Sequence, residues 1–315
     1  MRASPAGVEW PDEREQVIVA ESRVLVAGAN GQLGSAIVRK LTAAGVAVRA
    51  VGRNAQKLET LEAPGVETVA VDLLNLAALT AACRGVGQIV STANNNMGKG
   101  ATSPTKIDLT AHQNLCAAAR NAGVRRMLYV SAHGIDQDSP VDIFRIKWYI
   151  EDAIRRSGVP YVILRPTAFM DIWVDHIIAD AIRKKGTATI FGPGTARANY
   201  IAVEDVAEFV AKIVAREDVV NQVVEIGGPS TMSMNEVTTL VEKQLGGGGR
   251  RRHIPVFAMR LLPPVVRMFD EVAARMMTLG YFATTERSLP GWASAADRFG
   301  VRPRTLEQHI SGLSR

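Results

Sequence analysis

One stretch near the N-terminus limits the possible fold of this chain more than any other. Residues 24–34, VLVAGANGQLG, run from an apolar strand-like segment through three glycines into a helical pattern. Gly28 permits a tight turn, Gly31 allows the backbone to approach a ligand, and Gly34 lets the helix pack closely on the strand. Free N–H groups and the positive dipole end of such a helix favour an anion. The stretch therefore predicts a strand, turn and helix that bind the pyrophosphate of a dinucleotide.

The rest of the chain continues this alternation of strands and helices, which indicates a parallel sheet covered on both faces. We predict an α/β fold with a Rossmann-type doubly wound parallel sheet, complete at a last strand over 161–164. The NAD(P)-binding core is expected over 23–165, with a smaller substrate-binding or lid region over 166–315 that is interleaved with it. Residues 1–22 are expected to form a flexible extension.

Composition narrows the class of protein further. A chain of 315 residues with 47% hydrophobic content can bury a substantial core. The net charge of +6 comes from dispersed basic residues, so no nucleic-acid partner is expected. We interpret Gly246–Gly249 as a hinge or linker and Arg250–Arg252 as its solvated continuation.

Neither secretion nor a membrane partner is expected. The best apolar candidate, residues 254–269, is interrupted by Arg260, Arg267 and three prolines, so no membrane span is predicted. The two cysteines, Cys83 and Cys116, lack metal-ligand spacing and are too few for a disulfide framework, which favours a reducing, cytoplasmic location and no metal. A small-molecule substrate and a monomer or homodimer are the expected partner and assembly.

The choice between the two nicotinamide coenzymes is usually made at the end of the second strand. Here Arg53 follows Gly52 and no acid is present, which favours NADP (NADPH), because a guanidinium can pair with the 2′-phosphate. Asp72 and Leu73 could meet the adenine edge, although Asp72 could instead cap the next helix. The predicted cofactor-binding residues are Gly28, Asn30, Gly31, Gln32, Leu33, Gly34, Arg53, Asp72, Leu73, Ala93, Asn94, Ser131, Lys147 and Pro166.

Four segments together carry a family resemblance. GANGQLG at 28–34, VRAVGR at 48–53, AGVRRMLYVSA at 122–132 and GVPYVILRP at 158–166 resemble, in this order, the NmrA-like family of atypical short-chain dehydrogenases/reductases. The resemblance runs from about residue 23 to residue 313, with a secondary likeness to isoflavone-reductase-like enzymes. It implies an NAD(P)-binding protein and an NADPH-dependent reduction of a small carbonyl or conjugated molecule.

One position departs from the short-chain dehydrogenase pattern. Those enzymes place a tyrosine four residues before a lysine, which lowers the phenol pKa and holds the nicotinamide ribose. Lys147 resembles that lysine, but Ile143 stands at the tyrosine position and cannot transfer a proton. Ser131 could bond the substrate or the cofactor amide, or cap backbone groups at the strand end.

Three outcomes remain open for the chemistry. Lys147 itself could serve as the catalytic group, as the resemblance to the isoflavone-reductase-like branch implies. Alternatively, the protein only positions the reactants, and the proton comes from water, the substrate or His133, which follows the fifth predicted strand at 127–131. In the third outcome there is no turnover, and the chain is an NADP-binding redox sensor or a cofactor-stabilised assembly factor.

Overall fold

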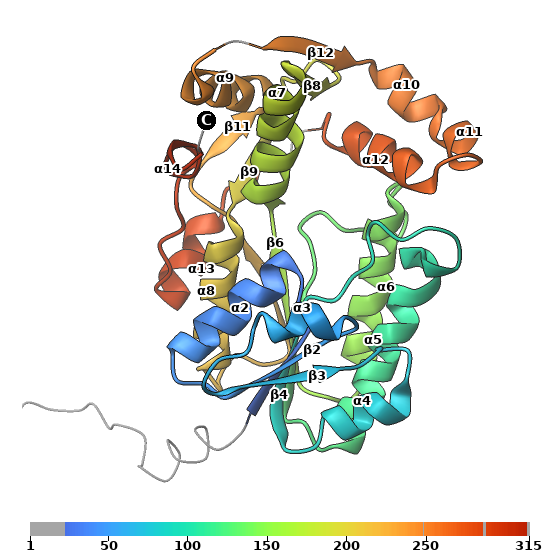
Figure 1. The fold of residues 1–315 in the computed structure, drawn as a ribbon, viewed down its shortest axis with the longest axis vertical. Coiled ribbons are helices and arrows are strands. Elements are labelled where there is room, and N and C mark those ends of the chain that lie inside the picture. The colour runs from blue at the N-terminus through green and yellow to red at the C-terminus, as the bar shows by residue number, and fades with distance from the viewer. Residues whose placement is uncertain (1–22, 248, 286–287, 314–315) are drawn as a thin grey trace, which may run out of the picture.

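The computed structural model describes residues 23–247, 249–285 and 288–313, so the predicted extension over 1–22 lies outside the described residues. A seven-stranded, fully parallel sheet forms its centre, in the order β10-β6-β5-β4-β1-β2-β3 (Figure 1). The predicted α/β class and Rossmann-type sheet are confirmed. Its strands are β1 (Arg23–Ala27), β2 (Val48–Gly52), β3 (Val66–Ala70), β4 (Val86–Ser91), β5 (Arg126–Val130), β6 (Tyr161–Pro166) and β10 (Gln222–Ile226).

Helices cover both faces of this sheet, and each face has its own apolar core. On one face Leu41, Phe209 and Phe299 pack together, and on the other Leu115 and Ile150 do so. The first face carries α2 (Gln32–Ala43), α3 (Ala55–Glu59), α8 (Val203–Val214) and α13 (Trp292–Phe299), and the second α4 (Leu76–Ala82), α5 (Pro104–Asn121) and α6 (Asp142–Arg156). Burial on both faces explains why the inner strands β1, β5 and β6 read as nearly continuous apolar runs rather than alternating patterns.

The sheet does not end at β6, as the sequence had suggested. β10 adds a seventh strand, with Val224 opposite Leu164 and Ile226 opposite Pro166. The expectation of a sheet complete at 161–164 is therefore wrong, because a short strand shows its own pattern in the sequence but not the strand beside which it pairs. The chain beyond β6 thus supplies one strand, β10, and two helices of the core.

A second lobe lies over the carboxyl ends of the central strands (Figure 1). It holds a three-stranded sheet, β11-β9-β7, a two-stranded parallel sheet, β12-β8, and several helices. Its strands are β7 (Ala168–Phe169), β8 (Thr187–Phe191), β9 (Arg197–Ile201), β11 (Thr231–Ser233) and β12 (Arg250–Ile254). Its helices are the π-helix η2 (Asp171–Ala179), α7 (Asp180–Lys185), α9 (Met234–Leu245), α10 (Val256–Leu261), α11 (Pro263–Arg267), α12 (Glu271–Phe282) and α14 (Leu306–Ser311), and the short η1 (Gly100–Thr102) precedes α5.

The residues on both sides of Gly248, which itself lies outside the described residues, belong to this lobe and do not form the predicted linker. Gly246 ends α9 in the left-handed conformation, with φ 79°. The Arg250 N–H donates to the Gly186 carbonyl, and Arg250–Arg252 pair with β8. An edge strand of a two-stranded sheet can expose polar side chains on both faces, so its sequence carries no apolar alternation. Within the described ranges, no helix combines the length and apolarity that crossing a membrane requires.

Candidate cofactor and substrate site

The glycine turn after β1 is so tightly packed that side chains do not fit. Gly28 has φ +83°, and a Cβ there would lie 2.8 Å from the Ala93 nitrogen. A Cβ on Gly34 would lie 2.1 Å from the Gly28 carbonyl oxygen. Since real Cβ atoms do not approach so closely, these glycines set the distance between β1 and α2 and bring β4 beside the turn.

The N-terminus of α2 opens into a cavity. Its N-cap is Gly31, which offers no side-chain cap, and the Ser35 N–H makes the first helical hydrogen bond, to the Gly31 carbonyl. The residues between them, Gln32 to Gly34, line the cavity. Unsatisfied amides and the helix dipole at such an end suit a phosphate group.

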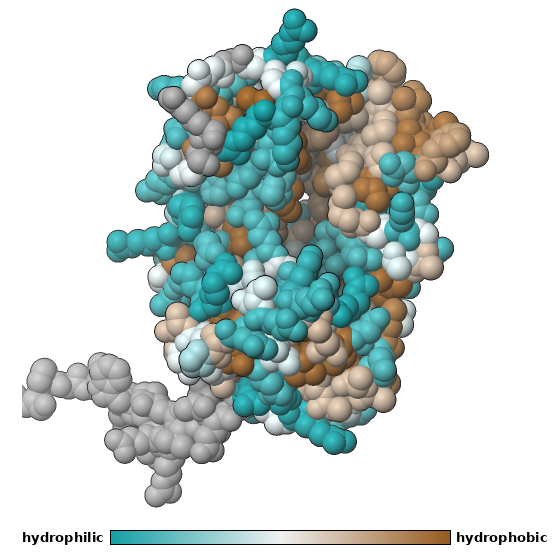
Figure 2. Space-filling view, viewed as in Figure 1, coloured by the Kyte–Doolittle hydropathy of each residue, from teal (hydrophilic) through white to brown (hydrophobic). Residues whose placement is uncertain are grey.

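This cavity of about 550 Å³ lies between the carboxyl edge of the central sheet and the second lobe. In Figure 2 the surface is hollowed between the two sides of the upper half of the molecule. All the site residues that the sequence predicted line the cavity: Gly28, Asn30, Gly31, Gln32, Leu33, Gly34, Arg53, Asp72, Leu73, Ala93, Asn94, Ser131, His133, Lys147 and Pro166. The fold thus brings together residues from the ends of six strands, β1 to β6, and from two helices, α2 and α6.

Arg53 and Asp72 lie at the end of the cavity beside β2 and β3. The exposed Arg53 guanidinium donates to Asn95 Oδ1 over 3.4 Å, which leaves it accessible to an anionic ligand. Asp72 accepts from the Leu74 N–H at 3.0 Å, whereas the cap of α4 is Asn75. The alternative interpretation of Asp72 as a helix cap is therefore wrong.

Lys147 lies at the other end, on α6. Its Nζ donates to the Val130 carbonyl over 3.3 Å and to the Tyr129 hydroxyl over 3.4 Å. Burial lowers the Lys147 pKa from 10.5 to about 8, although the carboxylates of Asp108 and Glu151 act in the opposite direction. An ammonium with this pKa is mostly protonated at neutral pH and releases its proton readily.

Ser131, His133 and Ile143 surround this lysine along the cavity wall. Ser131 Oγ is buried, and no described group accepts or donates a hydrogen bond to it. The interpretation of Ser131 as a backbone cap is therefore wrong, and its hydroxyl is available to a ligand. His133 Nδ1 lies 3.3 Å from Glu225 Oε2. Ile143 lines the cavity with a hydrocarbon side chain, so the position four residues before Lys147 supplies no proton.

Two buried polar residues of α5 were missed by the sequence analysis as parts of the site. Asp108 accepts from the Asn95 N–H at 3.1 Å, and burial raises its pKa. His112 bonds Ser91 Oγ through Nε2, and burial lowers its pKa to about 4, so it is neutral at physiological pH. The signal was their spacing of four, which places both on one helix face, but polar pairs at this spacing are common on exposed helices.

Apolar and aromatic residues from the second lobe and α6 form the remaining wall. They are Phe144, Trp173, Leu279 and Phe282, and Phe144 meets Phe282 edge to face with centroids 4.6 Å apart. α12 therefore covers the cavity beside the N-terminal end of α6. Such a wall suits an apolar substrate with a few oriented polar groups.

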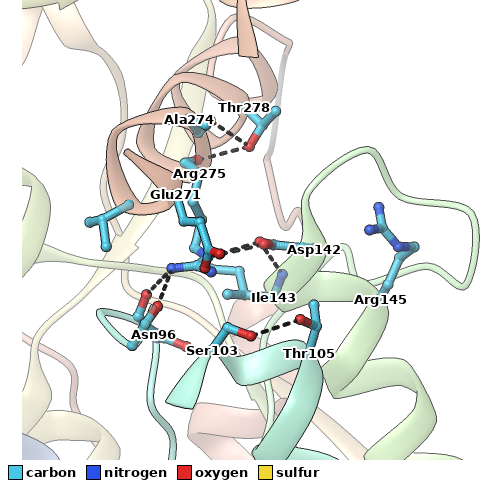
Figure 3. A network of polar contacts seen from close by, with 12 residues as sticks. Asn96, Ser103, Thr105, Asp142, Ile143, Arg145, Glu271, Ala274, Arg275 and Thr278 are labelled. Atoms are coloured by element: carbon cyan, nitrogen blue, oxygen red, sulfur yellow. Dashed lines mark hydrogen bonds and ion pairs between the residues drawn. The ribbon is translucent and has the colours of Figure 1, made fainter. Parts of the chain in front are cut away.

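A buried arginine joins α12 to the cofactor side of the cavity (Figure 3). Arg275 is only 2% exposed, and its Nε donates to both Asp142 carboxylate oxygens at 3.1 Å. Its Nη1 donates to the carbonyls of Asn96 and Gly98, in the loop that follows β4. Three segments far apart in the sequence are thus held at one guanidinium, and the Gly100 N–H adds a bond to Glu271.

Comparison with models of known families matches residues 20–309 to the NmrA-like family. The chain belongs to this family. The predicted resemblance is confirmed, and it covers nearly all of the described residues. The match spans the glycine turn, the central sheet and the second lobe.

Relatives of this NmrA-like protein have different roles. An NAD(P)H azoreductase of Xenophilus azovorans is 30% identical over 71% of this chain and 74% of its own. The photosystem II assembly factor Ycf39 of Trieres chinensis is 22% identical over 78% of this chain and 76% of its own. Among solved structures, the Escherichia coli quinone oxidoreductase QOR2 complexed with NADPH superposes with a TM-score of 0.77, at 22% identity, over 91% of this chain and 98% of that one. The relatives of this NmrA-like protein thus include both a reductase and an assembly factor.

Proposed function

We propose that this protein is an NADPH-dependent reductase of a small carbonyl or conjugated organic molecule. The observation that carries the proposal is the shared cavity. One end presents the open N-terminus of α2 and Arg53, and the other presents Lys147 and an unpartnered Ser131 hydroxyl beside an apolar wall. The azoreductase relative supports a reductive role.

The residues present fit a dinucleotide coenzyme. The glycine cradle at Gly28 and Gly34 leaves no room for side chains, and the α2 amides of Gln32 and Leu33 suit the pyrophosphate. Arg53 would hold the 2′-phosphate, and the other residues predicted for the cofactor would line its path. The coenzyme, when bound, supplies the hydride, and the protein supplies orientation and a proton.

Lys147 is the proposed catalytic residue of this protein. Because its pKa is about 8, Lys147 is mostly in the ammonium form at neutral pH. The ammonium group can donate a hydrogen bond or a proton to the substrate atom that gains negative charge. Ser131 would orient the same polar group of the substrate, and the wall of Phe144 and Phe282 would exclude water. His133, next to Glu225, is the second candidate proton source.

A non-catalytic role is the alternative, favoured by Ile143 in place of the usual phenol and by the assembly factor among the relatives. In that case the cavity would bind NADPH, and the bound coenzyme would stabilise the fold.

Turnover distinguishes the two proposals. Purified protein is mixed with NADPH and a panel of quinones, enones, ketones and azo compounds, and the loss of NADPH absorbance is followed. We expect oxidation with at least one class, and we expect Lys147→Met to reduce kcat/KM by about 100-fold or more while NADPH still binds. The matched control is Lys106→Met, an exposed lysine on α5. Tight NADPH binding with no turnover across the panel would favour the non-catalytic role, and absent binding of both coenzymes would overturn both proposals.

A further inference from the structure

The outer surface of α10 and α11 carries a group of large exposed apolar side chains. Phe257 is 66% exposed, Met268 80% and Phe269 86%. Leu261, Leu262 and Val265 are also exposed between them. In Figure 2 this surface, which we call the α10–α11 tip (residues 256–269), is the brown and tan projection at the upper right. Large contiguous apolar surface on a folded protein marks an interaction site.

The tip is attached to the protein through its opposite side only. Met259 and Pro263 are buried, and a Cβ on Gly280 of α12 would lie 3.0 Å from Met259 Sδ. α10 therefore packs against α12 through its buried residue Met259. The exposed phenylalanines and methionine take no part in it, so the apolar outer surface is not a requirement of this packing.

The charge around the tip is predominantly positive. Residues 250–269 contain five arginines, and the first acids after them, Asp270 and Glu271, accept hydrogen bonds from backbone N–H groups of α12 and of Gly100. Arg260 in α10 and Arg267 in α11 are exposed on the same two helices as the apolar side chains. A surface that combines bulky apolar side chains with arginines suits the interface of a bilayer, where basic groups lie near anionic headgroups.

We infer that the α10–α11 tip docks this protein onto an anionic lipid surface. The apolar side chains would enter the interface, and Arg260 and Arg267 would contact the negatively charged headgroups. A second copy of the chain fits the tip less well, because a two-fold contact between two tips would bring Arg260 and Arg267 of both copies together. The nearest acids, Asp270 and Glu271, already accept backbone hydrogen bonds within their own chain. The expectation that the protein has no membrane partner is therefore revised for binding at the membrane surface. It is unchanged for helices that span a membrane.

Vesicle binding tests this inference with the full chain. Protein is sedimented with vesicles of phosphatidylcholine alone and with vesicles that also contain phosphatidylglycerol. We expect binding to the anionic vesicles, weakened by added salt, and little binding to the neutral ones. Arg260→Gln/Arg267→Gln should weaken this binding by about 30-fold, and Met268→Ser/Phe269→Ser by about 100-fold.

Matched controls separate the tip from general effects of charge and hydrophobicity. Lys57→Gln/Arg84→Gln removes two exposed cations elsewhere, and Val220→Ser removes an exposed apolar side chain far from α10. Both controls should bind anionic vesicles as the unchanged protein does, and circular dichroism should show all variants folded. Equal binding to neutral and anionic vesicles, or equal losses in the controls and the tip variants, would overturn the inference. So would a dimer in sedimentation velocity that Met268→Ser/Phe269→Ser converts to monomer, because the tip would then be covered by a second copy.

Discussion

Replacing Lys147 with methionine should make the protein more stable while it removes the proposed proton donor. The Lys147 pKa falls from 10.5 to about 8 mainly through burial, so the fold holds the charged form at a cost of about 3 kcal/mol. Methionine fills a similar volume without the charge. The two hydrogen bonds that are lost, at 3.3 and 3.4 Å, are long, so they offset only part of the gain.

The sign of the pH dependence follows from the same pKa values. Below pH 8 the lysine is protonated in both the folded and the unfolded chain, so the whole penalty is present. Between pH 8 and 10.5 the unfolded chain binds more protons than the folded one, and the penalty shrinks as the pH rises. We therefore expect Lys147→Met to be more stable than the unchanged protein by about 1–3 kcal/mol near neutral pH, with this advantage lost by about pH 10.5.

Urea denaturation at several pH values, followed by circular dichroism, measures this difference. Lys106→Met, on the exposed side of α5, controls for the general effect of removing a lysine and should show no such pH dependence. In parallel, kcat/KM of the unchanged enzyme should fall about tenfold per pH unit above pH 8 if the ammonium is the donor. A Lys147→Met variant that is less stable than the unchanged protein near neutral pH would refute a buried charge at this position. So would a difference in the free energy of unfolding that is the same at every pH.

Three further substitutions test the site. Arg53→Ala should weaken NADPH binding about 10- to 100-fold and leave NADH binding nearly unchanged, with Arg84→Ala as a control; calorimetry that shows equal losses for both coenzymes would reject the 2′-phosphate role. Gly34→Ala should destabilise the fold by about 3 kcal/mol, because the new Cβ would lie 2.1 Å from the Gly28 carbonyl oxygen. The control Gly291→Ala places its Cβ in open space, so equal midpoints of thermal unfolding for the two variants would contradict the packing. Arg275→Met should cost about 3–5 kcal/mol by leaving Asp142 buried and unpaired, and adding Asp142→Asn should recover part of it; strictly additive losses in the double variant would argue against the ion pair.

Local patterns in the sequence were enough for six strands of the central sheet and for the predicted site residues. The order apolar strand, glycine turn and helix at 24–34 fixes its own geometry, because Gly28 and Gly34 meet each other within seven residues. Residues at the carboxyl ends of parallel strands come together at one edge of the sheet, so Arg53, Ala93 and Ser131 could be assigned to one site without knowing any contact.

Pairings between distant segments could not be predicted in this way. β10 looks like any short strand, and only its packing beside β6 makes it part of the central sheet. Arg250–Arg252 form a strand whose polar side chains point to solvent, so the backbone pairing with β8 leaves no trace in the pattern. The ion pair of Asp142 and Arg275 joins residues 133 positions apart, and each alone resembles an ordinary surface charge.

The guanidinium of Arg275 has a consequence for synthesis on the ribosome. A nascent chain that has emerged as far as residue 226 already contains all seven strands of the central sheet, so that sheet can assemble early. The carbonyls of Asn96 and Gly98 are hydrogen-bonded only after Arg275 has been made, about fifty residues beyond residue 226. We therefore expect the loop after β4 to be fixed only late in synthesis, and a product truncated before α12 to have the sheet without the bonds that hold this loop.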